Sequence, residues 1–194
     1  REELISQFDV SKINKNSPIF ETQKLDWMNK QYIKATNPAD IEKQINELSV
    51  LSEEAKNFLQ DEGVFQKAIL LAKDRMSKLT DFEGMVSFLW KENLEYDPKI
   101  LSSKDLDEEE TKTILNTSLE IINAIKEENW EEENLRKTFM DYTEKNNIKR
   151  GDMLWPLRVA VTGLEQSPDV FGVMDILGKE KSIARISNAV EKLQ

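Results

Sequence analysis

The stretch LWPLRVAVTGLEQSP, at positions 154–168, places one arginine, Arg158, in a run of otherwise apolar or small residues. A buried, unpaired guanidinium costs free energy, so Arg158 needs a partner or a purpose. One interpretation is structural: the side chain carries its charge to the rim of the apolar surface or pairs with a carboxylate. The other is functional: a rigid fork of donors at the mouth of a cleft suits the acceptors of an unpaired base.

A second set of donors is expected just downstream of Arg158. The sequence predicts a helix that begins with Ser167 as its N-cap and Pro168 in its first turn. The N–H groups of such a helix start have no partner within the helix and point outward. The segment around Arg158 is therefore the strongest candidate for a binding site.

Other kinds of chemistry have little support in the sequence. The chain contains no histidine and no cysteine, which excludes histidine-based triads, Cys/His zinc sites and disulfides. The acidic clusters at 107–110 and 131–135 lack the alternating ligands and the glycine of a calcium loop, and are expected to be solvated helix starts. We therefore predict no catalytic residue and no metal ligand in this chain.

The net charge of −10 argues against a nucleic-acid partner when taken alone. The charge is uneven, however. Residues 105–144 contain 13 acidic and 4 basic residues, whereas residues 147–194 contain 6 acidic and 7 basic ones. Binding depends on the local face and not on the total, so a nearly neutral or basic surface remains open to RNA.

Helical spacing of apolar residues recurs along the chain, and strand-like alternation is nearly absent, so we predict an all-α protein with about ten helices. One stripe is expected to face inward from Leu25, Met28, Tyr32 and Ile33, and another from Phe65, Ile69 and Leu70. Gly163 and Gly178 are expected to end helices. The expected helical stretches are 17–35, 37–51, 52–60, 61–76, 80–90, 107–130, 131–146, 151–163, 167–178 and 179–193.

The stretch 93–105 has a proline, two serines and little periodicity, which is typical of a connector. We place a boundary there, with one helical subdomain at 1–94 and a second at 95–194. The chain begins at Arg1 instead of a methionine, and the expectation is that it belongs to a longer protein. The absence of a long apolar run argues against a membrane span.

Three motifs resemble the C-terminal region of bacterial-type glutamyl-tRNA synthetases. The most specific is PLRVAVTGLEQSPDVFGVMDILGKE; the others are FDVSKINKNSPIFETQKLDWMNKQYIK and LAKDRMSKLTDF. The resemblance covers nearly the whole chain. It implies two helical parts that follow a catalytic domain, the first contacting the tRNA stem and the second closing a helical cage around the anticodon.

The resemblance also implies roles for individual residues. Arg158 matches an arginine that binds an anticodon base, and Arg75 matches one that reads the first anticodon base. Ser167 and Val170 match positions that line the same pocket, where the family often has Thr and Leu. ATP and Mg would bind in the catalytic domain, which attaches glutamate to tRNA, and not in this chain.

The resemblance further implies a cytoplasmic protein whose partner is glutamate tRNA, without DNA or membrane partners, and we expect a monomer. The high negative charge motivates an alternative of a different class, a helical protein-interaction scaffold without RNA specificity. Binding to cognate and random RNA distinguishes the two hypotheses.

Overall fold

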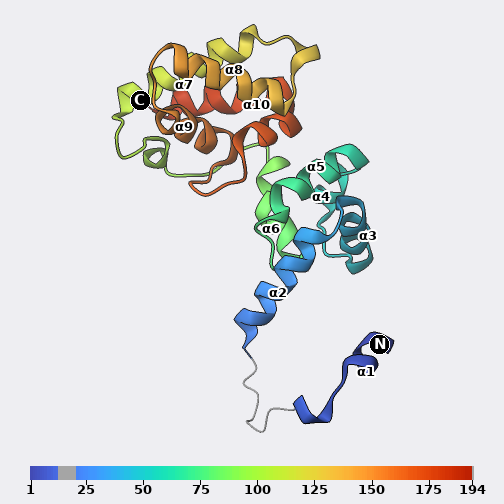
Figure 1. Cartoon of the computed structure of the whole chain (residues 1–194). Coiled ribbons are helices and arrows are strands. Elements are labelled where there is room, and N and C mark those ends of the chain that lie inside the picture. Colours follow the sequence, from blue (N-terminus) through green and yellow to red (C-terminus); the bar gives the residue numbers. More distant parts are fainter. Residues whose placement is uncertain (13–20, 194) are drawn as a thin grey trace.

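The computed structural model describes residues 1–12 and 21–193, and this part of the chain contains ten α-helices, several short 3₁₀ turns and no strand. The prediction of an all-α protein is confirmed. No described helix combines the length and the apolarity that crossing a bilayer would require. Figure 1 shows two helical groups, one within residues 22–89 and the other within residues 98–192.

Helix α1 (Glu2–Gln7) lies apart from both groups. The first group consists of α2 (Thr22–Ala35), α3 (Pro38–Leu48), α4 (Glu53–Phe58), α5 (Glu62–Lys73) and α6 (Phe82–Val86), with 3₁₀ turns at Leu79–Asp81 and Ser87–Leu89. The second group consists of α7 (Glu108–Ala124), α8 (Glu132–Lys145), α9 (Arg150–Thr162) and α10 (Val170–Lys192), preceded by a 3₁₀ turn at Pro98–Leu101.

Side-chain caps explain where several helices begin. Asn37, Ser52 and Asp61 each accept a hydrogen bond from the backbone N–H three residues on, at the starts of α3, α4 and α5. Asp107 and Glu110 form a reciprocal capping box at the start of α7. Three acidic residues in the first turn also interact favourably with the positive end of the helix dipole. The acidic cluster at 107–110 is therefore a helix start.

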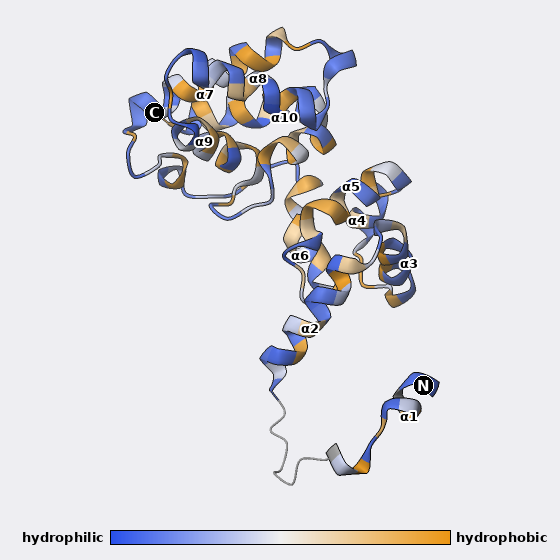
Figure 2. Cartoon of the chain, viewed as in Figure 1, coloured by the Kyte–Doolittle hydropathy of each residue, from blue (hydrophilic) through white to orange (hydrophobic). Residues whose placement is uncertain are grey.

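The core of the second group forms between α10 and the helices α7, α8 and α9. Phe139 of α8 and Phe171 of α10 are buried and pack with their ring centroids 5.5 Å apart. Leu115 and Ile122 of α7 are fully buried. Figure 2 shows hydrophobic residues on α7 and α8, and also on α5 and α6 of the first group.

Two predicted apolar stripes were wrong in part. Leu25, Met28 and Tyr32 of α2 are 49%, 41% and 70% exposed, and only Ile33 of that stripe is buried. The reason is that α2 runs out from the rest of its group, so that only its last turn reaches the core (Figure 1). Leu70 of α5 is also exposed, because it faces away from the buried side of that helix and lines a pocket.

Both predicted helix-ending glycines adopt positive φ. Gly163 ends α9 with φ 72°, and Gly178 interrupts α10 with φ 77°, after which the helix resumes. An L-residue is strained in this region, whereas glycine is not. Gly163 also has little room, since an added Cβ would lie 3.2 Å from Tyr96 and 3.4 Å from Leu94.

Gly163→Ala is expected to lower the free energy of unfolding by about 1–2 kcal/mol, the cost of a left-handed conformation for a residue with a Cβ. Thermal melting followed by circular dichroism measures the change. Gly151→Ala is the control, because Gly151 is helical and an added Cβ there meets nothing within 4 Å. Equal melting temperatures for the two variants would contradict the assigned strain.

Cationic side chains of α10 connect the two groups by binding backbone carbonyls. Arg185 donates to the carbonyl oxygens of Phe88 and Lys91, both at 2.7 Å, and also to that of Val161. Lys181 donates to Leu89 O at 2.8 Å. These bonds tie the last turn of the first group to the second. The boundary between 94 and 95 stays a prediction.

Candidate nucleic-acid interface

A pocket of about 480 Å³ lies at the junction of α5 and the start of α10, and we call it the junction pocket. Its walls come from α5, from the loop between α9 and α10, and from the first turns of α8 and α10. The residues that line it are Lys67, Leu70, Leu71, Asp74, Arg75, Glu132, Ser167, Pro168, Asp169, Gly172, Asp175 and Ile176. Two of the four predicted site residues, Arg75 and Ser167, are among them.

The carboxylates of the junction pocket are all paired with cations. The pairs are Asp175 with Lys67 at 2.7 Å, Asp74 with Lys34 at 3.3 Å, and both Glu132 and Asp169 with Arg136 at 2.7 and 2.8 Å. The hydrogen bond to Asp169 is the largest of the effects that raise the pKa of Arg136. The negative charge around the pocket is therefore largely neutralised within the protein.

Arg75 has no carboxylate partner within residues 1–12 and 21–193, in contrast to the other cations around the pocket. One of its terminal nitrogens donates to the carbonyl oxygen of Gln166 at 3.3 Å, which bridges α5 to the loop before α10. The residue is otherwise exposed. A guanidinium offers five donors, so most of those of Arg75 remain available to a ligand in the pocket.

Ser167 lies in the pocket, but its predicted role as a helix cap was wrong. Its hydroxyl donates to Pro168 O at 3.0 Å, and α10 begins at Val170 with Asp169 as its N-cap. The Asp169 carboxylate accepts from Phe171 N at 3.0 Å and Gly172 N at 3.1 Å. Aspartate directly before an apolar run is itself a preferred cap, and that signal was overlooked.

Val170 is 1% exposed and belongs to the core of the second helical group. It is the first residue of α10, directly after the Asp169 cap, and it is not among the residues that line the junction pocket. Direct contact with a base would require an accessible side chain. The structure therefore gives Val170 a packing position beside Asp169.

Arg158 lies in α9 with its Nε buried and without a hydrogen-bond partner. In the described part of the chain its guanidinium forms no ion pair and no hydrogen bond, so pairing with a carboxylate, one form of the structural interpretation, is not observed. Arg158 is also not among the residues that line the junction pocket. The structure brings Arg75 and Ser167 together and leaves Arg158 as a separate, unsatisfied donor group.

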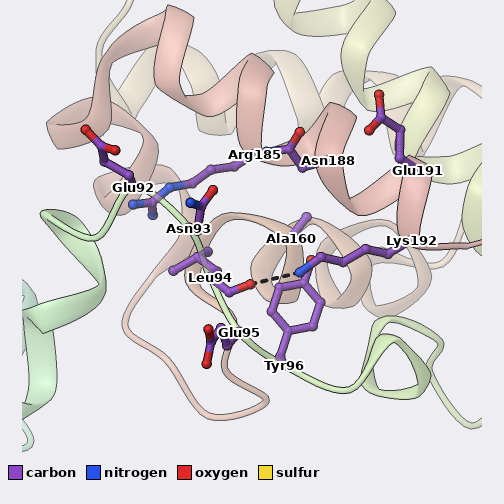
Figure 3. Close-up of a pocket in the computed structure, with 10 residues that line it drawn as sticks. All are labelled: Glu92, Asn93, Leu94, Glu95, Tyr96, Ala160, Arg185, Asn188, Glu191 and Lys192. Carbon is purple, nitrogen blue, oxygen red and sulfur yellow. Dashed lines mark hydrogen bonds between the residues drawn. The ribbon is translucent and has the colours of Figure 1, made fainter.

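A second pocket, of about 720 Å³, lies between residues 92–96 and the end of α10 (Figure 3). Lys192 donates to Leu94 O at 2.8 Å and lies 4.0 Å from the centre of the Tyr96 ring, and burial raises the pKa of Tyr96 to about 12. The three glutamates that line this pocket form no ion pair in the described part of the chain, unlike the four carboxylates of the junction pocket, and Lys192 is already bonded to Leu94. The junction pocket is therefore better suited to a polyanion.

The fold and the junction pocket define an all-α domain that offers a guanidinium without a carboxylate partner and a hydroxyl in one cavity, the kinds of donor that bind unpaired bases. The chain belongs to the anticodon binding domain family, which matches residues 50–190. All the junction-pocket residues, and Arg158, fall within that range.

Related proteins match along the whole chain. It is 31% identical to a glutamate–tRNA ligase of Clostridium acetobutylicum and 33% identical to one of Clostridium botulinum strain Okra, in both cases covering 100% of this chain and 39% of the relative. A solved glutamate–tRNA ligase of Elizabethkingia meningosepticum superimposes with a TM-score of 0.80 at 25% identity, covering 100% of this chain and 37% of that one. The chain thus spans about two fifths of the length of these relatives.

Proposed function

We propose that this chain recognises the anticodon of glutamate tRNA as the C-terminal part of a glutamate–tRNA ligase. The observation that carries the proposal is that Arg75, which has no carboxylate partner in the described part of the chain, and Ser167 line the same pocket. This pocket lies inside the region that matches the anticodon binding domain family. The glutamate–tRNA ligases that match along its full length support the identity of the tRNA.

The chemistry of the pocket fits an unpaired nucleotide. The Arg75 guanidinium can donate two parallel hydrogen bonds to base or phosphate acceptors, and it stays charged. The Ser167 hydroxyl can donate and accept. The apolar side chains of Leu70 and Ile176 also line the pocket and supply surface against which a base can pack. Arg158, with its unsatisfied Nε, is the proposed second anticodon contact.

The rest of the proposed reaction belongs to other parts of a ligase. The ATP and Mg that glutamate activation requires are assigned to a catalytic domain, and the described residues hold no group of three or more Asp or Glu side chains placed to bind a metal ion. We propose a cytoplasmic monomer without DNA or membrane partners. The contribution of this chain is the selection of the tRNA.

Binding of RNA by the whole chain tests the proposal. A stem-loop carrying the glutamate anticodon should bind more tightly than the same stem-loop with a changed anticodon. Its affinity should fall as salt rises, because each neutralised phosphate contributes a salt-dependent term. Arg75→Gln should reduce the preference for the glutamate anticodon by about 5-fold or more, since a good base contact is worth about 1–3 kcal/mol. Fluorescence anisotropy over a salt series measures both effects.

Arg150→Gln is the matched control, because Arg150 is an exposed arginine that does not line the junction pocket. It should leave the anticodon preference unchanged. Equal binding of all RNA sequences by the unmodified chain at low salt would refute anticodon recognition and favour the scaffold hypothesis.

A further inference from the structure

The two walls of the junction pocket come from different helical groups. Arg75 extends from the turn that ends α5, whereas Ser167 lies in the loop before α10. The distance between these donors depends on how α5 sits against α10, two helices that are in contact. A recognition site tolerates displacements of only about 0.5 Å in its donors. Contacts between α5 and α10 are therefore candidates for control of specificity.

One such contact is an ion pair between Lys67 of α5 and Asp175 of α10. The Lys67 Nζ lies 2.7 Å from Asp175 Oδ2, and the Asp175 side chain is only 12% exposed. A carboxylate this deeply buried needs a cation, because its desolvation is otherwise uncompensated. The Lys67 side chain is 53% exposed, so its position is set mainly by Asp175. Both residues line the junction pocket.

The helices also approach closely beside this ion pair. A Cβ added to Gly172, one turn before Asp175, would lie 2.8 Å from Leu71 Cδ2 and 3.1 Å from Glu132 Oε2. The absence of a side chain at 172 therefore allows α5 to seat directly on α10. The close approach of the helices at Gly172 and the Lys67–Asp175 pair lie at the same place, next to the wall that carries Arg75.

We propose that the Lys67–Asp175 ion pair is a positioning element that fixes the width of the junction pocket and so sets its selectivity among anticodons. This inference rests on the proposed function. Neither residue is required to touch RNA. Because Asp175 is largely buried, each single variant should also lose some stability, and the reversed pair should regain part of it.

A charge swap tests the inference. Lys67→Asp and Asp175→Lys should each reduce the preference for the glutamate anticodon stem-loop by about tenfold, within the usual range for coupled contacts. The double variant restores the ion pair in reverse and should recover at least half of the logarithmic loss. A double variant as defective as Lys67→Asp would overturn the inference, because it would show that Lys67 binds RNA directly.

The second measurement does not depend on RNA. The chain has no cysteine, so two introduced at exposed Glu62 of α5 and Glu165 of the loop can be spin-labelled uniquely. Double electron–electron resonance should give one narrow distribution of distances between the two labels. This distribution should broaden in each single variant and narrow again in the charge-swapped double variant. Unchanged distances would overturn the positioning role even if RNA selectivity falls. Non-selective RNA binding with the expected distance changes would refute only the proposed anticodon function.

The matched control is the same swap at Lys43 and Glu47, an exposed pair within α3 with 4.0 Å between its charged atoms. Neither residue lines the junction pocket. Lys43→Glu, Glu47→Lys and their combination should leave both the RNA preference and the spin-label distances unchanged. An equal loss of preference in these variants would point to a general effect of charge and would overturn the assignment to Lys67 and Asp175.

Discussion

Arg185→Met is expected to lower the free energy of unfolding by about 3 kcal/mol, because it leaves three carbonyl groups without their donor and each unsatisfied buried acceptor costs about 1–3 kcal/mol. The carbonyls belong to Phe88 and Lys91 at the end of the first helical group and to Val161 in α9. Arg185 is 4% exposed, so water replaces these bonds poorly. Methionine keeps an apolar stem of similar length.

The cost of burying the charge of Arg185 partly offsets the stabilisation that its hydrogen bonds provide. Burial lowers its pKa from the ordinary value of an arginine to about 10, so the guanidinium is still charged at neutral pH. Because the folded state holds this proton less tightly than the unfolded state, the burial cost is fully present below pH 10 and is relieved as the pH rises above 10. The variant removes that cost together with the hydrogen bonds. We therefore expect a net loss of stability at the low end of the sum of the three hydrogen-bond contributions.

Urea denaturation at pH 7 measures the change in the free energy of unfolding. In thermal unfolding, the melting temperature should fall by about 6–12 °C for a chain of this size. Arg150→Met is the control, since Arg150 is exposed and surface substitutions usually change stability by less than about 0.5 kcal/mol. If Arg185→Met were as stable as Arg150→Met, the carbonyl contacts of α10 would not couple the two helical groups.

Arg158→Met is expected to reduce discrimination between the glutamate anticodon and a changed anticodon by about 5–150-fold, the value of one good bidentate contact. Its effect on folding should be the opposite of that of Arg185→Met. The Arg158 Nε is buried without a partner, so its removal relieves a desolvation cost and should leave stability unchanged or slightly higher. A gain in stability with a loss of selectivity is the expected signature of a binding residue.

Affinities for the two stem-loops and urea denaturation of the same preparations measure the two effects. Arg158→Lys is the control for charge, because lysine keeps the cation and lacks the planar fork of donors. It should recover affinity for both RNAs while selectivity stays low. Loss of stability in Arg158→Met, with selectivity retained, would return Arg158 to the structural interpretation.

Much of the fold could be predicted from the sequence, because local signals agree with the helices that form. Ser52 caps α4, Gly163 ends α9, and Gly178 interrupts α10 at the position where a helix end was expected. Local signals fail where a helix lacks a packing partner. The stripe on α2 reads as buried by its spacing, yet most of it is exposed, because spacing reports the side of a helix and not what covers it.

The site could be predicted only in part. Arg75 and Ser167 were selected by resemblance to a family, and no sequence pattern indicates that residues 92 positions apart line one pocket. The position of Val170 in the core was not foreseen. Arg185 was missed altogether: it stands in a helical stretch that also contains Lys181, Ser182 and Ser187, so its neighbours do not mark it, yet it is more deeply buried than Arg158.

The partners of the α10 cations have a practical consequence. Lys181 and Arg185 bind uncharged carbonyl groups in partly or fully buried surroundings, where mobile counterions screen an electrostatic contact much less than they do at an exposed surface. The internal architecture should thus persist at ionic strengths that dissociate a polyanion. Elution with concentrated electrolyte should then return the chain intact and ready to bind again.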